Sequence, residues 1–416
     1  MKHIPGKRPL LILSDSFSSR LFLGSGIVRS IKDRLKGDLD VLAAFDITAA
    51  RDLYDFDYAK WTDPEGIKVR LESELLKDRK LTLSQRMRIT VDRHIDAIIG
   101  YYPMTMRFNM KHGFMRDRMT WGNANPYLNL KLGWPFSGSE VIYRMMNSWY
   151  YGKQRYFHPA ITEYMSKNTS CLLTANLQFK STQPYIITAD RLNIPIYANI
   201  ASWDHPVGKG IVFKGCVRYV VQNTYMKEAL QQYHNIPGNR IIITGWPQTD
   251  LFARKTSEFD YKSLLASYGL DPDRPCILIA GNSPANAPYE PEFIRKFLET
   301  WRKTDKNRDY SVVFRPHPKD STWRKRYTGI ANDGYLYVQP ASFSDIDVLS
   351  MLLQHVNCVV SNAGTILLDS LVNARPVVCV LYDEGAPSGS GYAVKNITGH
   401  HYQDLMSSGA FYKANS

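Results

Sequence analysis

The stretch that decides the fold is Asn357–Val380, NCVVSNAGTILLDSLVNARPVVCV. An apolar run (358–360) ends in a small polar loop (361–365), and a segment with helical periodicity (366–372) follows it. A second apolar run (376–381) completes the order strand, loop, helix, strand, which is the repeating unit of a parallel sheet. The stretch therefore predicts an α/β domain.

The loop between the first strand and the helix has the residue types of an anion site. It consists of Ser361, Asn362, Ala363, Gly364 and Thr365. Free backbone N–H groups and the helix dipole favour negative charge at such a helix start. Gly364 lets the backbone approach a ligand, and the two hydroxyl groups are donors. The alternative is an ordinary helix cap, in which the side chains satisfy the helix's own donors.

Length and composition predict two soluble domains. A chain of 416 residues is longer than chains that usually fold around one hydrophobic core, and a content of 44% hydrophobic residues is enough for two cores. No apolar run approaches the roughly 18 residues of a membrane span. The five cysteines lie far apart without a C-x-x-C pair, so neither a zinc site nor a disulfide framework is expected. We expect a cytosolic protein, with no cofactor and no metal.

The net charge of +13 points to an anionic partner. Because the chain contains no zinc finger, RNA-binding signature or basic-helix pattern, we do not expect it to bind nucleic acid. A phosphate-bearing substrate fits better, and an anionic membrane surface is a further candidate partner.

Apolar runs alternate with helical segments along most of the chain, which predicts two parallel-sheet domains. We place them at residues 1–255 and 270–416, with the boundary in the polar stretch 250–273. The first contains an insertion at about 85–165. Within it, residues 101–160 hold 7 of the 13 Met and 8 Lys/Arg against 2 Asp/Glu, by count. This segment is either a helical insertion packed on the first domain or a surface for lipid headgroups.

Two further motifs of the second half follow predicted strands. Gly281, Asn282 and Ser283 form a small loop that can approach a diphosphate. In Arg315-Pro316-His317-Pro318 the prolines hold the backbone, so that His317 projects from a strand end and can donate to a leaving phosphate. Asp369, one turn into the helix after the decisive loop, is a candidate to accept hydrogen bonds from ribose hydroxyls, or an ordinary exposed or capping carboxylate.

The first half offers candidate bases. Trp203, Asp204, His205 and Lys209 crowd one loop after a predicted strand, where α/β proteins place their ligands. A carboxylate beside an imidazole offers a general base, whereas a simple turn is the alternative. Asp15, after the first strand, is either a second candidate base or a helix cap.

The motifs SWDHPVGKG, NTYMKEALQQYHNIPGNRIIITGWPQTDLF, RPHP and SNAGTILLDSLVNARPVV, taken in order, resemble bacterial surface-polysaccharide glycosyltransferases of the GT-B fold. The resemblance is strongest to the branch related to CDP-glycerol glycerophosphotransferases, and UDP-N-acetylglucosamine 2-epimerases are more distantly similar. It extends from about Ile194 to Ser416. It implies two Rossmann-like domains facing each other across a cleft, the second holding the nucleotide and the first presenting the acceptor.

By this resemblance His317 contacts the donor phosphate, and Ser361 and Thr365 lie in the phosphate-binding loop. Asp204 falls near a catalytic His of the family, so that either Asp204 or His205 is the base, with Trp203 and Lys209 at the acceptor. The family pattern continues with further helices, so by this resemblance the second domain, 270–416, is expected to lack its last helices.

The sequence is thus interpreted as a metal-independent glycosyltransferase of the cell envelope, acting at the inner face of the plasma membrane. It is expected to move a sugar from a nucleotide-activated donor to a glycan or lipid-linked acceptor, as in capsule or O-antigen synthesis. The alternatives are CDP-glycerol-type polyol-phosphate transfer and a non-catalytic module that binds glycans or partner proteins.

Overall fold

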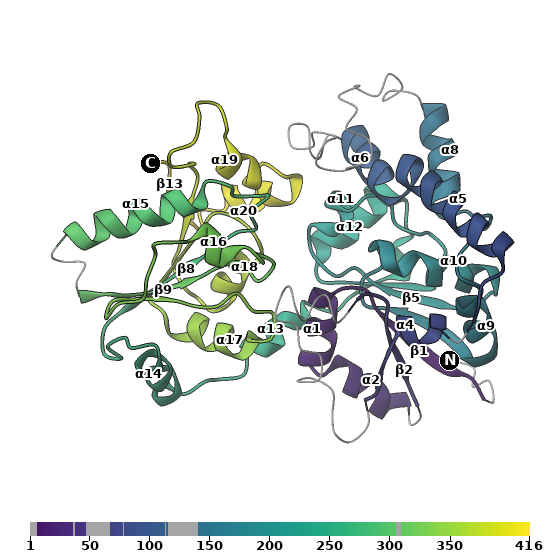
Figure 1. Ribbon diagram of the computed structural model, residues 1–416, viewed down its shortest axis with the longest axis horizontal. Coiled ribbons are helices and arrows are strands. Elements are labelled where there is room, and N and C mark those ends of the chain that lie inside the picture. Colours follow the sequence, from purple (N-terminus) through teal and green to yellow (C-terminus); the bar gives the residue numbers. More distant parts are fainter. Residues whose placement is uncertain are drawn as a thin grey trace. The chain divides into compact units, whose positions relative to one another are not determined.

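A computed structural model of the protein describes residues 6–35, 38–46, 67–77, 79–112, 114, 140–304 and 309–416. The described chain forms two compact units, one running up to Pro247 and the other beginning at Gln248. Each unit is built on a parallel sheet with helices packed against it (Figure 1). The predicted α/β class with two parallel-sheet domains is confirmed.

The first unit contains a seven-stranded sheet in the order β3-β2-β1-β4-β5-β6-β7. Its strands are β1 (Arg8–Leu13), β2 (Asp40–Ala43), β3 (Val69–Leu71), β4 (Thr169–Thr174), β5 (Ile196–Asn199), β6 (Arg218–Val221) and β7 (Ile241–Ile243). Every neighbouring pair is parallel. In β1 the residues from Leu10 to Leu13 are all buried, which is why the strand is a continuous apolar run.

The helices of this unit connect the strands or belong to the insertion. They are α1 (Ser16–Gly24), α2 (Ile27–Leu35), α4 (Glu72–Lys77), α5 (Leu83–Ile99), α6 (Tyr101–His112), α8 (Glu140–Tyr150), α9 (Pro159–Asn168), α10 (Gln183–Arg191), α11 (His205–Gly208) and α12 (Thr224–His234). Phe108 of α6 and Tyr150 of α8 share a buried cluster with Val207, Ile211 and Ala229. The described part of the insertion is thus helical and packs on the first domain. The aromatic stretch 115–139 lies outside the described residues.

The second unit contains a six-stranded sheet in the order β10-β9-β8-β11-β12-β13. Its strands are β8 (Cys276–Ala280), β9 (Ser311–Arg315), β10 (Leu336–Val338), β11 (Cys358–Ser361), β12 (Val377–Val380) and β13 (Tyr412–Ala414). The strand, loop, helix and strand predicted from Asn357–Val380 are therefore present as β11, α18 (Thr365–Val372) and β12.

Helices cover both faces of this second sheet (Figure 1). Ile294 and Leu298 of α15 (Glu290–Lys303) pack on one face, and α14 (Glu258–Ser267) and α17 (Ile346–His355) pack on the other. The remaining helices are α13 (Pro247–Phe252), α16 (Trp323–Arg326), α19 (Tyr392–Ile397) and α20 (Gln403–Ser407). Each face of the sheet thus has its own apolar core.

The observed division after Pro247 differs from the predicted boundary at 250–273. Leu251 and Phe252 of α13, with Tyr261 and Leu265 of α14, are buried in the core of the second unit. The segment was interpreted as a linker because polar and charged residues separate its few apolar residues. Those apolar residues nevertheless pack on the second sheet. Within the described residues, no helix combines the length and apolar character that crossing a bilayer requires.

Candidate functional site at the edge of the second sheet

The connections of the second sheet diverge between β8 and β11. From β8 the chain proceeds to β9 and β10 on one side, and from β11 to β12 and β13 on the other. Such a switch in strand order leaves a crevice at the carboxyl ends of the two strands, where open α/β sheets bind ligands. The loops 281–283 and 361–365 follow these two strands, so the sheet brings the two predicted phosphate loops to the switch point.

Asn282 is the most informative residue at this edge. It is only 5% exposed, and its backbone N–H donates to Glu290. Its side-chain Nδ2 has no hydrogen-bond acceptor among the described residues. Its Oδ1 lies 3.9 Å from the point where a Cβ on Gly364 would sit, so the side chain lies beside the loop that opens α18. A buried amide donor without an acceptor is costly, and a bound oxygen atom would satisfy it.

The start of α18 supplies further donors. Gly364 has φ = 106°, in the region that favours glycine, and it caps the helix without a side-chain hydrogen bond. Its own N–H donates to the hydroxyl of Tyr402 at 2.7 Å. Thr365 and Ile366 contribute the next N–H groups of the first turn, which intrahelical bonds leave without acceptors. These amides and Asn282 form a neutral cradle of donors that suits an anion.

His317 follows β9, the neighbour of β8. Its backbone nitrogen lies 3.4 Å from the point where a Cβ on Gly281 would sit, so the two loops are in contact. The N–H of Lys319 donates to Nδ1 of His317 at 3.0 Å. In a neutral imidazole this places the proton on Nε2, which is then a donor. The predicted role of His317 as a donor to phosphate is consistent with this tautomer.

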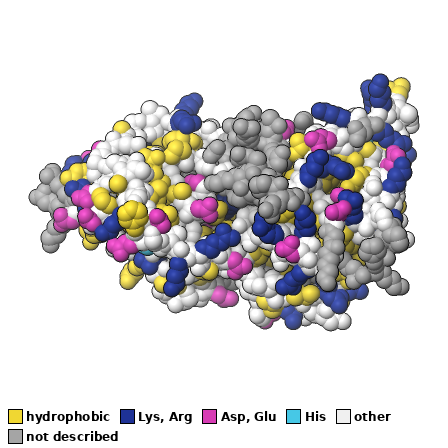
Figure 2. Space-filling view, turned by 90° about the horizontal axis from the view of Figure 1, so that it is seen from below, with side chains coloured by type: hydrophobic (Ala, Val, Ile, Leu, Met, Phe, Trp, Pro, Cys, Tyr) yellow, Lys and Arg dark blue, Asp and Glu magenta, His cyan; other side chains and the backbone are white. Residues whose placement is uncertain are grey.

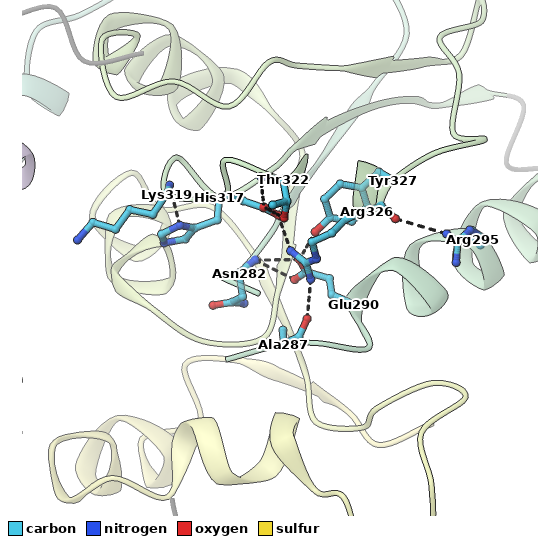
Figure 3. Close-up of polar contacts among 10 residues, drawn as sticks. Asn282, Ala287, Glu290, Arg295, His317, Lys319, Thr322, Arg326 and Tyr327 are labelled. Carbon is cyan, nitrogen blue, oxygen red and sulfur yellow. Dashed lines mark hydrogen bonds and ion pairs between the residues drawn. The ribbon is translucent and has the colours of Figure 1, made fainter. Parts of the chain in front are cut away.

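Glu290 was not predicted from the sequence, yet it joins these loops (Figure 3). Its carboxylate accepts from the backbone N–H of Asn282 at 2.9 Å and from the hydroxyl of Tyr327 at 2.7 Å. Arg326, which pairs with Asp320 and donates to the carbonyl of Ala287, adds positive charge nearby. Burial nevertheless raises the pKa of Glu290 to about 7, against the hydrogen bonds and this charge. Glu290 thus orients the Asn282 loop and titrates near neutrality.

Several predicted donor-binding residues serve the fold instead. Both guanidinium Nη atoms of Arg315 bind Asp345, at 2.5 Å each, so the expected phosphate contact of Arg315 is not supported. Asp369 is 2% exposed, and both its oxygens accept from Nε2 of Gln248, so its expected ribose contact is not supported either.

The buried residues of the decisive loop also make internal contacts. Ser361 donates to the carbonyl of Ala280 at 2.8 Å, which ties the loop to β8. Asn362 donates to the carbonyls of Val380 and Ala393. Ala363 is buried beside them, and the carbonyl of Ser283 accepts from Asn286 in a tight turn. These residues shape the loop, and the donors that fit a ligand come from Asn282, His317 and the amides after Gly364.

In the first domain, Asp15 is a helix cap. Its Oδ1 accepts from the N–H of Ser18 at 2.9 Å, and its Oδ2 accepts from Ser18 Oγ and Asn176 Nδ2. The capping alternative is therefore what the structure shows, because both oxygens complete the start of α1.

The loop after β5 contains the other candidate bases. Asp204 occupies the N-cap position of the short helix α11 without a side-chain capping hydrogen bond and is partly exposed, whereas Trp203 and His205 are buried. Lys209 is partly exposed, and its backbone carbonyl accepts from Thr105 of α6. The structure thus gathers these residues in one loop, with Asp204 more accessible than His205.

His234 of α12 was not predicted from the sequence, and it forms hydrogen bonds with the segment that follows Asp204. It accepts from the N–H of Val212 at Nδ1 and donates from Nε2 to the carbonyl of Pro206 at 2.7 Å. Burial lowers its pKa to about 4, so the imidazole is neutral near pH 7. No group of three metal-ligating side chains occurs within the described ranges.

Replacing Arg315 by Met tests whether this side chain is structural. Removal leaves the largely buried carboxylate of Asp345 without its ionic partner and with only the neutral amide of Gln339 donating to it, which should cost about 3–5 kcal/mol of unfolding free energy. The matched control is Arg302→Met, whose exposed pair with Asp333 should contribute less than about 1 kcal/mol. Chemical denaturation measures both. Unchanged stability combined with lost nucleotide binding would instead make Arg315 a ligand of the donor.

The raised pKa of Glu290 predicts a pH-dependent stability. Between its ordinary pKa of 4.5 and about 7, the folded state binds more protons than the unfolded state, so this group lowers the unfolding free energy as pH rises. Glu290→Gln should therefore gain stability relative to wild type from pH 4.5 to 8. The control Glu292→Gln, on the exposed face of α15, should show no such trend. Denaturation midpoints across this pH range would reject the assignment if both variants behaved alike.

Comparison with known proteins relates part of the chain to a family of transferases. The family model described as CDP-Glycerol:Poly(glycerophosphate) glycerophosphotransferase matches residues 212–387. This segment contains the loops after β8, β9 and β11 described above. No curated protein matches the chain.

Solved structures provide the comparison of folds. A UDP-GlcNAc 2-epimerase from Methanocaldococcus jannaschii is similar with a TM-score of 0.50 and 10% identity, over 98% of this chain and 89% of that one. The same enzyme in complex with UDP-GlcNAc and UDP gives a TM-score of 0.51 and 9% identity over the same shares. The chain is therefore related to the glycerophosphotransferase family and has the two-domain Rossmann-like architecture of GT-B proteins.

Proposed function

We propose that the protein is a GT-B-type transferase that uses a nucleotide-activated donor, and that its second domain binds the donor's diphosphate. The observation that carries the proposal is the buried side chain of Asn282, whose Nδ2 lacks an acceptor among the described residues and whose Oδ1 lies beside Gly364 at the start of α18. The family match supports a transferase of this general kind. The M. jannaschii neighbour, solved with UDP-GlcNAc and UDP, has a similar fold.

In the proposed reaction, a base in the first domain takes the proton of an acceptor hydroxyl. The acceptor oxygen forms a bond to the anomeric carbon of the donor sugar while the bond from that carbon to the diphosphate oxygen breaks. The electron pair leaves on the diphosphate oxygen, where Nε2–H of His317 and the first-turn amides of α18 stabilise it. We favour Asp204 as the base over His205, because Asp204 is partly exposed and His205 is buried.

The second candidate is transfer of a polyol phosphate, and the family model's description favours it. There the acceptor oxygen would attack the phosphorus of a CDP-activated polyol, and CMP would leave. The same cradle would serve, since the leaving group is again a phosphate oxygen. The acceptor we propose is a cell-envelope glycan, and membrane association remains part of this proposal. Among the residues drawn in colour in Figure 2, Lys and Arg side chains are dispersed.

Replacing His317 by Ala tests the proposal. The variant loses a donor at the leaving phosphate, and turnover should fall about 10²-fold or more with the fold intact. Lys325→Ala, which removes an exposed cation from nearby α16, is the control and should retain wild-type turnover. The assay compares UDP-, GDP- and CMP-activated sugars with CDP-glycerol, each with a glycan acceptor. Near-wild-type transfer by the His317 variant would remove this residue from the site.

A thermal-shift screen of UDP, GDP, CDP and CMP separates the alternatives. A nucleotide with a Kd of about 1 µM, tested at 100 µM, should stabilise the protein by about 2.7 kcal/mol. Consumption of CDP-glycerol with nucleotide sugars ignored would select polyol-phosphate transfer. No stabilisation by any nucleotide would contradict the enzyme and favour a glycan- or partner-binding module.

A further inference from the structure

The first domain contains a cavity of about 1010 Å³ that the donor site does not use. Its walls come from α4, α5, the start of α10 and the segment 155–158. Because α10 follows β4 through a short connection, its first residues lie at the carboxyl edge of the sheet, where α/β domains bind ligands. The volume is at the upper end of the range for small-ligand sites.

Gln183 indicates that the cavity is built to hold a ligand. It is 2% exposed, and its Oε1 accepts from Nη1 of Arg155 at 2.9 Å. Its Nε2 has no acceptor within the part of the chain that the structure describes. Since Gln183 lines the cavity, an oxygen atom of a ligand there would accept this buried N–H.

The charges that line the cavity nearly cancel. Arg155 contacts Asp96 at 2.7 Å and Asp92 at 3.6 Å, and Lys180 contacts Asp96 at 3.0 Å. The ionic side chains of the lining are the cations Arg86, Arg93, Arg155 and Lys180 and the carboxyl groups of Glu72, Asp92 and Asp96. Paired charges leave little net attraction for an anion and offer both donors and acceptors. This combination suits hydroxyl groups, which donate and accept at once.

The carboxyl groups of Glu72 and Asp92 line the cavity and are held by neighbouring donors. Glu72 accepts from the hydroxyl of Tyr185 at 2.7 Å, and Asp92 accepts from the N–H of Tyr156 at 3.4 Å. Their remaining lone pairs can accept hydrogen bonds from the hydroxyl protons of a ligand.

Two aromatic residues extend the site. Tyr156 and Phe157 line both this cavity and a second one of about 350 Å³, which Arg79, Pro159 and Arg191 also line. Aromatic side chains present flat apolar surface beside a polar group, which matches the apolar C–H face of a sugar ring. The two adjoining cavities accommodate more than one ring of an extended chain.

We propose that these cavities bind a neutral, hydroxyl-rich oligosaccharide, with one ring against Gln183 and the next along Tyr156 and Phe157. The inference rests on the proposed function insofar as this saccharide is part of the glycan acceptor. Binding of the saccharide by itself requires neither donor nor turnover.

The test fills the cavity without removing a buried contact. Thr90 is an exposed residue of α5 that lines the cavity, so Thr90→Trp places an indole in it. Ser84→Trp puts the same side chain at an exposed position of α5 that does not line the cavity. The probes are chitotriose, maltotriose, mannotriose and an array of neutral and acidic bacterial glycans, with inorganic phosphate and glycerol 3-phosphate as anionic competitors. Saturation-transfer NMR on the full chain and array binding are the readouts.

We expect at least one neutral saccharide to bind, Thr90→Trp to weaken it at least 10-fold, and Ser84→Trp to leave it unchanged. The anionic competitors should not displace it. Failure of every neutral saccharide, displacement by either phosphate compound, or unchanged binding by Thr90→Trp would overturn the inference. Nucleotide binding is measured on the same samples. If no nucleotide binds while a saccharide does, the proposed function alone is rejected. If a nucleotide binds while no saccharide does, this inference alone is rejected.

Discussion

The close approach of three loops at the carboxyl edge of the second sheet is the constraint on which the candidate site depends. A Cβ at position 281 would lie 3.0 Å from a carboxylate oxygen of Glu290 and 3.4 Å from both the carbonyl of Arg315 and the nitrogen of His317. Because Gly281 has no Cβ, the end of β8 can contact both the end of β9 and the carboxylate of Glu290. Gly364, with its positive φ, brings the third loop beside Asn282. Larger side chains at these two glycines would separate the donors that the site brings together.

The positive potential at this edge comes from backbone and side-chain dipoles and from an imidazole more than from unpaired cations. The nearest guanidinium in the motif, Arg315, is held by Asp345, and Arg326 is held by Asp320. The groups near the switch point are Asn282, the first turn of α18 and His317, whose neutral imidazole carries its proton on Nε2. Preorganised donors of this kind stabilise charge that develops on a leaving group without having to reorient during the reaction. The internal ion pairs hold the loops in place, and Glu290 connects the Asn282 loop to α15.

Much of the second domain could be predicted from the sequence, because buried parallel strands are continuous apolar runs. The apolar run 358–360 located β11 to within one residue, and the loops after the predicted strands followed from position alone. The short strands β3 and β13 were not predicted. Residue roles were harder to predict. Asp369 binds Gln248, which lies 121 positions away, and Arg315 binds Asp345, 30 positions away. A sequence shows which groups can pair, and the fold decides which do.

The same reason explains why Glu290 and His234 escaped notice. Glu290 has the sequence signature of an ordinary acid in a first helical turn, and only its burial in the fold raises its pKa, against the hydrogen bonds from Tyr327 and the Asn282 N–H. His234 looks like a residue at the end of a helix, yet its two ring nitrogens hold the loop that carries Asp204. In both cases the partners come from other elements, and burial changes the chemistry of the group.

The most direct measurement of the central claim is a titration of CDP and UDP into ¹⁵N-labelled protein, followed by amide chemical shifts. If the second domain grips a diphosphate as described, the resonances of Thr365, Ile366 and the Asn282 side-chain amide will move together and saturate at one affinity. If a nucleotide binds while these three resonances stay fixed and others move, the diphosphate lies elsewhere and the account is contradicted.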